Sequence, residues 1–102
     1  MKTIINGRKY DTDTAKFIAT DWSDIPKNDF AYWEESLYRK KTGEFFLYGY
    51  GGPMSIYSKT IGQNEWITGE KIIPMTIEQA RAWGEKHMTV WSYEETFGAV
   101  EE

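Results

Sequence analysis

A glycine-rich segment, LYGYGGPMSIY at residues 47–57, follows an apolar run, as a phosphate-binding loop follows a strand. Such a loop needs backbone N–H groups aimed at the phosphate, a Lys-Ser/Thr pair and a helix that begins behind it. The segment lacks the Lys-Ser/Thr pair, no helix is predicted directly after it, and Pro53 removes one N–H. We therefore predict a turn in which the glycines supply backbone dihedral angles that other residues resist.

Pairs of carboxylates perform acid–base chemistry only when both groups reach the same bond. Glu34 and Glu35 are consecutive in a predicted strand, so their side chains should point to opposite faces of the sheet. Glu94 and Glu95 lie about 100° apart on a predicted short helix, where a capping role explains them. Neither pair predicts a catalytic site.

Nucleophiles and metal ligands are scarce in this chain. His87 is the only histidine and there is no cysteine, which excludes multi-histidine zinc sites, thiolate nucleophiles, disulfides and cysteine-bound clusters. Ser55 does not lie in a G-x-S-x-G elbow, and no motif joins it to His87. We expect no enzyme activity, no cofactor and no metal site.

Basic and aromatic residues adjoin in YRKKTGEFFLY at residues 38–48. Arg39, Lys40 and Lys41 could contact phosphates while tyrosines such as Tyr48 stack on unpaired bases. The three basic residues also lie at a predicted hairpin turn, where lysines serve to keep a strand edge soluble. Single-stranded nucleic-acid binding through these residues is the alternative function that we retain.

The composition is that of one small globular domain, residues 1–102, with 40% hydrophobic and 27% charged residues. Its net charge of −4 is opposite to the basic balance of nucleic-acid binders and suits a basic protein partner. Aromatic residues make up 17% of the chain, more than a core of this size needs, so we expect exposed rings. No apolar stretch approaches the roughly 20 residues of a membrane span, and we expect a cytoplasmic protein without membrane contact.

Local patterns in the first half of the chain predict two hairpins and a helix. Asn6-Gly7 between β-prone runs predicts a two-residue hairpin turn. Residues 11–22 predict a short helix, because acidic and threonine caps precede apolar residues that share one helical face. Residues 30–50 predict a hairpin that turns at residues 41–43, where a glycine can adopt a left-handed conformation.

The second half predicts one strand and two helices. EKIIP at residues 70–74 predicts a last strand that its proline ends, and a capping box at Thr76 begins a helix. A final short helix is predicted from a cap at Thr89 or Ser92 to a stop at Gly98. We expect an α+β fold: a small antiparallel sheet built on a central β-hairpin, with one short N-terminal helix and two C-terminal helices packed on it.

Four segments stand in a characteristic order: INGRKYDTDTAKFIA, EESLYRKKTGEFFLYGYGGPMSIY, EKIIPMTIEQARAWGEKH and YEETFGAVEE. Across nearly the whole chain they resemble a family of small proteins encoded on plasmids, prophages and conjugative elements of Gram-positive bacteria. The resemblance implies no catalytic residues. It implies a mobile-element setting, in which small acidic accessory proteins bind and block host defence machinery such as CRISPR effector nucleases.

The leading hypothesis is therefore a non-enzymatic accessory protein of a mobile element that binds another protein, as an anti-CRISPR-like inhibitor of a host defence nuclease. The partner would be a basic nucleic-acid-handling protein of the host, bound through acidic faces and aromatic anchors. The candidate anchors are Tyr48, Tyr50, Met54, Tyr57 and Trp66. A third possibility is an interaction module that only forms a homodimer.

Overall fold

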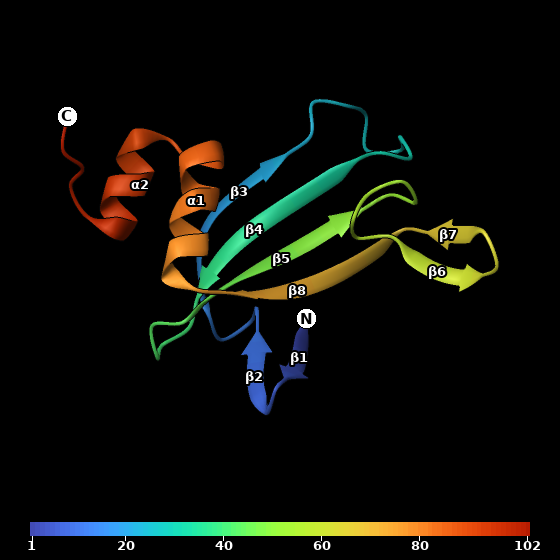
Figure 1. The fold of residues 1–102 in the computed structure, drawn as a ribbon, viewed down its shortest axis with the longest axis horizontal. Helices are drawn as coiled ribbons and strands as arrows, with labels where there is room; N and C mark the ends of the chain where they lie inside the picture. Colours follow the sequence, from blue (N-terminus) through green and yellow to red (C-terminus); the bar gives the residue numbers. More distant parts are fainter.

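Four antiparallel strands form the sheet at the centre of the molecule (Figure 1). A computed structural model describes residues 1–102. The strand order is β3 (Lys16–Trp22), β4 (Trp33–Arg39), β5 (Phe45–Gly51) and β8 (Gly69–Met75). The α+β class with an antiparallel sheet is thus confirmed.

Strands β4 and β5 occupy the middle of this sheet and pair without interruption, from Arg39 opposite Phe45 to Trp33 opposite Gly51. Gly43 in the connecting turn has a φ of 96°, a conformation that favours glycine. The turn is closed by two backbone hydrogen bonds between residues 40–44, from Lys40 N–H to the Glu44 carbonyl and from Gly43 N–H to the Lys40 carbonyl.

The prediction of a helix over residues 11–22 is wrong, because residues 16–22 form strand β3. Phe17, Ile18 and Trp22 are aromatic or β-branched residues that favour extended backbone, and the edge of β4 supplies hydrogen-bonding partners. The register shifts between Phe17 and Ala19, which is a bulge in this outer strand. Asp11, which we expected as a helix cap, instead accepts a hydrogen bond from the Asp13 N–H in a turn.

The N-terminal hairpin joins β1 (Lys2–Ile5) and β2 (Arg8–Asp11). Asn6 and Gly7 have φ angles of 51° and 77°, which confirms the predicted turn with two left-handed residues. The hairpin packs on the sheet through Tyr10, which is buried.

Two helices follow β8 and lie together on the face of the sheet opposite to the N-terminal hairpin (Figure 1). Helix α1 (Ile77–His87) begins with the predicted capping box at Thr76, and α2 (Val90–Phe97) is capped by Thr89 and ends at Gly98 with a φ of 98°. The helix count is therefore two and not three. Neither helix is long and apolar enough to cross a membrane.

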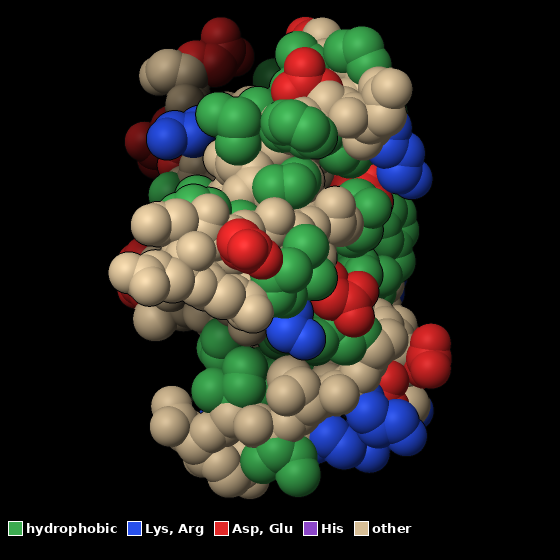
Figure 2. Space-filling view, turned by 90° about the vertical axis from the view of Figure 1, so that its right-hand side faces the viewer, with side chains coloured by type: hydrophobic (Ala, Val, Ile, Leu, Met, Phe, Trp, Pro, Cys, Tyr) green, Lys and Arg blue, Asp and Glu red, His purple; other side chains and the backbone are tan.

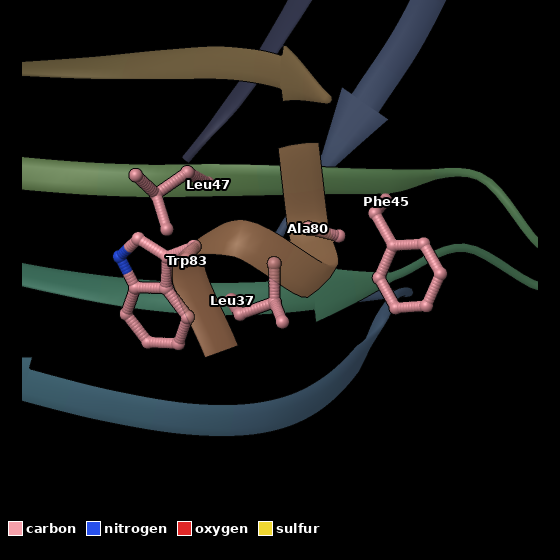
Figure 3. Packing of buried hydrophobic residues seen from close by; sticks show 5 residues of the cluster. All are labelled: Leu37, Phe45, Leu47, Ala80 and Trp83. Atoms are coloured by element: carbon pink, nitrogen blue, oxygen red, sulfur yellow. The ribbon is translucent and has the colours of Figure 1, made fainter. Parts of the chain in front are cut away.

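The core consists of one small cluster on each face of the sheet. On the helix face, Ala80 and Trp83 of α1 pack on Leu37, Phe45 and Leu47 of the middle strands (Figure 3). On the opposite face, which we call the outer face, the buried residues are Tyr10, Phe46 and Ile72. Neighbouring residues of β5 contribute to the two clusters in alternation, as the side-chain period of a strand requires.

Two further features concern β8 and the segment that precedes it. Strand β8 continues through Pro74 to Met75, beyond the proline that we expected to end it, and β8 is an outer strand, where proline is tolerated. Between β5 and β8, β6 (Lys59–Gly62) and β7 (Glu65–Ile67) form a separate hairpin that projects from one end of the molecule (Figure 1). Every residue of these two short strands is exposed.

Candidate functional site

The glycine-rich segment, residues 47–57, comprises the last five residues of β5 and all but the last residue of a turn over residues 52–58. Gly49 and Gly51 lie in β5, and none of Gly49, Gly51 and Gly52 has a positive φ. Our expectation that these glycines supply unusual dihedral angles is therefore wrong. They are needed for space, because a Cβ at Gly49 would lie 2.0 Å from the Tyr57 ring and one at Gly52 would lie 2.5 Å from the Phe30 carbonyl oxygen.

Tyr57 corrects one of the predicted partner contacts, because only 2% of this residue is exposed. Its ring lies over Gly49, and its hydroxyl donates a hydrogen bond to Glu35. Burial, with the Glu35 carboxylate as the further cause, raises the pKa of the Tyr57 hydroxyl well above its ordinary value. Tyr57 therefore holds the turn on the sheet and cannot serve as an exposed anchor.

Hydrogen bonds fix the backbone of the 52–58 turn. Gly52 N–H donates to the Tyr32 carbonyl at 2.8 Å, and Met54 N–H donates to the Phe30 carbonyl at 2.7 Å. The Ser55 hydroxyl donates to the Gly52 carbonyl at 2.8 Å. These bonds hold the turn against the loop before β4, and they present Met54 to solvent with 73% of its surface exposed.

A groove of about 400 Å³ lies between this turn and the helix face of β4. Its apolar lining includes Trp33, Met54 and Ile56, and its polar lining includes Glu35 and His87. Ile56 has 72% of its surface exposed, so the rim of the groove is apolar and accessible. A concave site with a few fixed polar groups is the usual form of a binding site.

Glu35 and His87 are each engaged by neighbouring side chains. Glu35 accepts a hydrogen bond from Trp83 Nε1 at 2.8 Å in addition to the one from Tyr57. His87 Nδ1 lies 2.8 Å from Asp21 Oδ2, and its ring lies 4.8 Å from the Trp83 ring. These contacts join α1 to the sheet and make the polar floor of the groove rigid.

Ser55 and His87, which no sequence motif connects, both line the groove. The Ser55 oxygen accepts a hydrogen bond from the Tyr57 N–H while its proton is donated to the Gly52 carbonyl. His87 directs one ring nitrogen to Asp21 and makes no hydrogen bond to Ser55. The two side chains therefore stabilise separate parts of the structure.

The exposed hairpin carries further apolar side chains at the same end. Exposed fractions are 55% for Ile61, 50% for Trp66 and 40% for Ile67. Seen from this end, hydrophobic side chains gather between polar ones (Figure 2). We call this surface the apolar end and define it by Met54, Ile56, Ile61, Trp66 and Ile67.

Tyr48 and Tyr50 lie apart from the groove, because they point to the outer face of β5. The Tyr48 hydroxyl donates a hydrogen bond to Glu70. Burial is the main cause that raises the pKa of Tyr48 above its ordinary value, and this hydrogen bond is the second. Lys27 Nζ lies 5.9 Å from the centroid of the Tyr50 ring. Because Tyr48 and Tyr50 lie on the opposite face of the sheet from the groove, the five predicted anchors do not form one surface.

The alternative set, Arg39, Lys40 and Lys41, lies at the opposite end of β4 from the groove. Lys40 is largely enclosed: its Nζ lies 3.7 Å from the centroid of the Tyr10 ring and 3.7 Å from a Glu44 oxygen. Phe46, which follows these basic residues in the YRKKTGEFFLY segment, is fully buried. Phe46 is thus not available for stacking beside the three basic side chains, and Tyr48 is half-buried with its hydroxyl bonded to Glu70.

No group of three or more histidine, aspartate and glutamate side chains could hold a metal ion. In the comparisons with known proteins, no family model, no curated protein and no solved structure matches the chain.

Proposed function

We propose that this protein is a non-enzymatic module that binds another protein through the apolar end. The observation that carries the proposal is the β6–β7 hairpin, which exposes Ile61, Trp66 and Ile67 while no other element covers it. A two-stranded hairpin is at best marginally stable in water by itself, and it gains stability when a surface packs on it. A binding partner would supply that surface.

The neighbouring 52–58 turn supports the same function by its rigidity. The turn is held by hydrogen bonds to the Tyr32 and Phe30 carbonyls and by the burial of Tyr57. These contacts fix the positions of Met54 and Ile56 before a partner binds. A preorganised surface loses less conformational entropy on binding than a mobile one. Tryptophan and methionine are also enriched at protein interfaces, and tryptophan is a frequent anchor of binding energy.

Charge near the apolar end favours a partner with a basic rim. The loop before β4 and the segment from β6 to the start of β8 carry four carboxylates and three lysines: Asp24, Asp29, Glu65, Glu70, Lys27, Lys59 and Lys71. Complementary charge around an apolar contact contributes specificity and a faster association rate. A basic nucleic-acid-handling protein, such as a host defence nuclease that this module would inhibit, is the partner class that we propose.

The proposal is tested by capture from a host lysate with immobilised protein, followed by a nuclease-protection assay on the captured partner. Trp66→Ala and Ile56→Ser should each reduce capture about tenfold or more, because truncation of an interface anchor costs 2 kcal/mol or more. Ile4→Ser is the matched control, since Ile4 is 74% exposed in β1, away from the apolar end. Equal capture by all three variants would contradict the proposal.

Homodimer formation is separated from partner binding by sedimentation velocity. If the wild-type chain sediments as a dimer and Trp66→Ala as a monomer, the partner at the apolar end is a second copy. A monomer that captures a host protein supports the proposal as stated. Urea unfolding of each variant shows whether the substitution has disturbed the fold.

A further inference from the structure

Three adjoining grooves lie along the opposite end of the sheet from the apolar end. The first, of about 170 Å³, and the second, of about 370 Å³, share Lys40 and Lys41 in their linings. The second shares Lys16 and Arg39 with the third, of about 340 Å³. Lys9 lines the first. We call the surface formed by Lys9, Lys16, Arg39, Lys40 and Lys41 the basic track.

Most cations of the basic track lack an acidic partner. Lys40 is paired with Glu44, whereas Lys9, Lys16, Arg39 and Lys41 make no ion pair. The Arg39 guanidinium lies 5.6 Å from the centroid of the Phe45 ring. Only two carboxylates line the three grooves, Asp11 and Glu95. In a chain of net charge −4, this is a strongly local concentration of positive charge, and an anion that bound there would relieve the repulsion between the cations.

The third groove ends the basic track with two accessible aromatic rings. Trp91, near the start of α2, has 75% of its surface exposed, and Phe17 in β3 has 52% exposed. The Phe17 ring is held edge-to-face against Tyr38, with centroids 5.8 Å apart. The first turn of α2 has no acidic residue, so the positive end of its dipole adds to the positive charge of this groove.

We propose that the basic track binds single-stranded nucleic acid, with phosphates along Lys9, Lys41, Lys16 and Arg39 and a base stacked on Trp91, the more exposed of the two rings. Unpaired bases expose the flat faces that aromatic rings bind, whereas the bases of a duplex are already stacked on one another. A polyanion without aromatic groups, such as polyglutamate, would use the cations but has nothing to stack on the two rings. This site is distinct from the apolar end, because the two surfaces lie at opposite ends of β4, which is about 20 Å long.

Fluorescence anisotropy with a labelled oligothymidylate tests this site in the intact protein. Four phosphate contacts predict that binding weakens about 50-fold between roughly 50 and 200 mM monovalent salt. Trp91→Ala should weaken binding about tenfold through lost stacking. Lys16→Glu with Lys41→Glu should abolish it, because both substitutions reverse a contact charge.

Matched controls decide whether the basic track is the site. Val90→Ala changes a side chain that is 75% exposed beside Trp91, and Lys71→Glu changes a lysine outside the track, so both should leave the affinity unchanged. Absence of binding at the lower salt concentration would overturn the proposal, as would an equal loss in the controls. Equal affinity for duplex DNA or for polyglutamate would overturn it as well, since neither offers an unpaired base.

Discussion

The two hairpins outside the central sheet have similar turns, but only one of them packs on that sheet. β1–β2 turns at Asn6-Gly7 and β6–β7 turns with Asn64 at a φ of 59°, so an asparagine accepts the left-handed conformation in both. Tyr10 of the first hairpin packs edge-to-face on Phe46 at 5.5 Å, whereas all residues of the second are exposed. Local sequence specifies that a hairpin forms, and contact with the sheet decides whether it stabilises the fold or is available to a partner.

The largest expected effect is the difference in the free energy of unfolding between two variants that each lose one aromatic residue, one from each hairpin. Tyr10→Ala removes a buried ring that contacts Phe46, and it should lower the free energy of unfolding by about 3 kcal/mol. Trp66→Ala removes a larger ring from an exposed position and should change the free energy of unfolding by less than about 0.5 kcal/mol. Urea unfolding measures both. A loss in Trp66→Ala as large as that in Tyr10→Ala would show that the second hairpin packs on the domain.

A smaller effect compares two strand glycines. In Gly49→Ala the new Cβ would collide with the Tyr57 ring at 2.0 Å, and we expect a loss of about 2 kcal/mol in the free energy of unfolding. In Gly62→Ala, in β6, the nearest atom is 3.6 Å away, which is ordinary van der Waals contact. The second substitution should be nearly neutral in the same urea experiment. Equal losses would contradict the assignment of Gly49 as a close-packing position.

The smallest expected effect depends on pH. The hydrogen bond from Arg8 of β2 to Glu44, 2.9 Å long, is the main cause that lowers the pKa of Glu44 in the folded protein. A carboxylate whose pKa is lower in the folded protein stabilises the fold at pH values above the ordinary carboxyl pKa. This stabilisation is lost as the pH falls through the pKa of the folded protein. Arg8→Gln should therefore lower Tm slightly at pH 7 and not at pH 2.

The matching change in the other hairpin is Lys59→Gln, since Lys59 in β6 makes no ion pair. Its Tm should equal that of the wild type at both pH values. Scanning calorimetry provides the four comparisons. A Tm difference for Arg8→Gln that persists unchanged at pH 2 would assign the effect of Arg8 to packing and not to the charge of Glu44.

Capping and turn residues made much of the fold predictable. Asn6-Gly7, the turn at Gly43 and the capping box at Thr76 depend on neighbours within a few residues, so their chemistry is visible in the sequence. Residues 16–22 were assigned wrongly because their extended form is imposed by β4, which lies distant in the sequence. An apolar spacing that fits a helix can also fit a strand with a bulge.

The candidate surfaces were predictable only in part. The sequence places Arg39, Lys40 and Lys41 together because they are consecutive, but Lys9, Lys16 and Trp91 join them only through the fold. The burial of Tyr57 likewise depends on the space above Gly49. No local pattern indicates which aromatic residue of a glycine-rich segment will fold back onto its own strand.

Both outer strands of the central sheet resist the addition of another chain. The bulge in β3 interrupts the regular row of hydrogen-bonding groups on one edge, and Pro74 lacks an N–H on the other. Fibrils grow by continuing such a row from molecule to molecule, and the bulge and the proline each shorten the row that this sheet offers. The chain can therefore expose apolar side chains at one end while the two edges of its sheet disfavour ordered self-polymerisation.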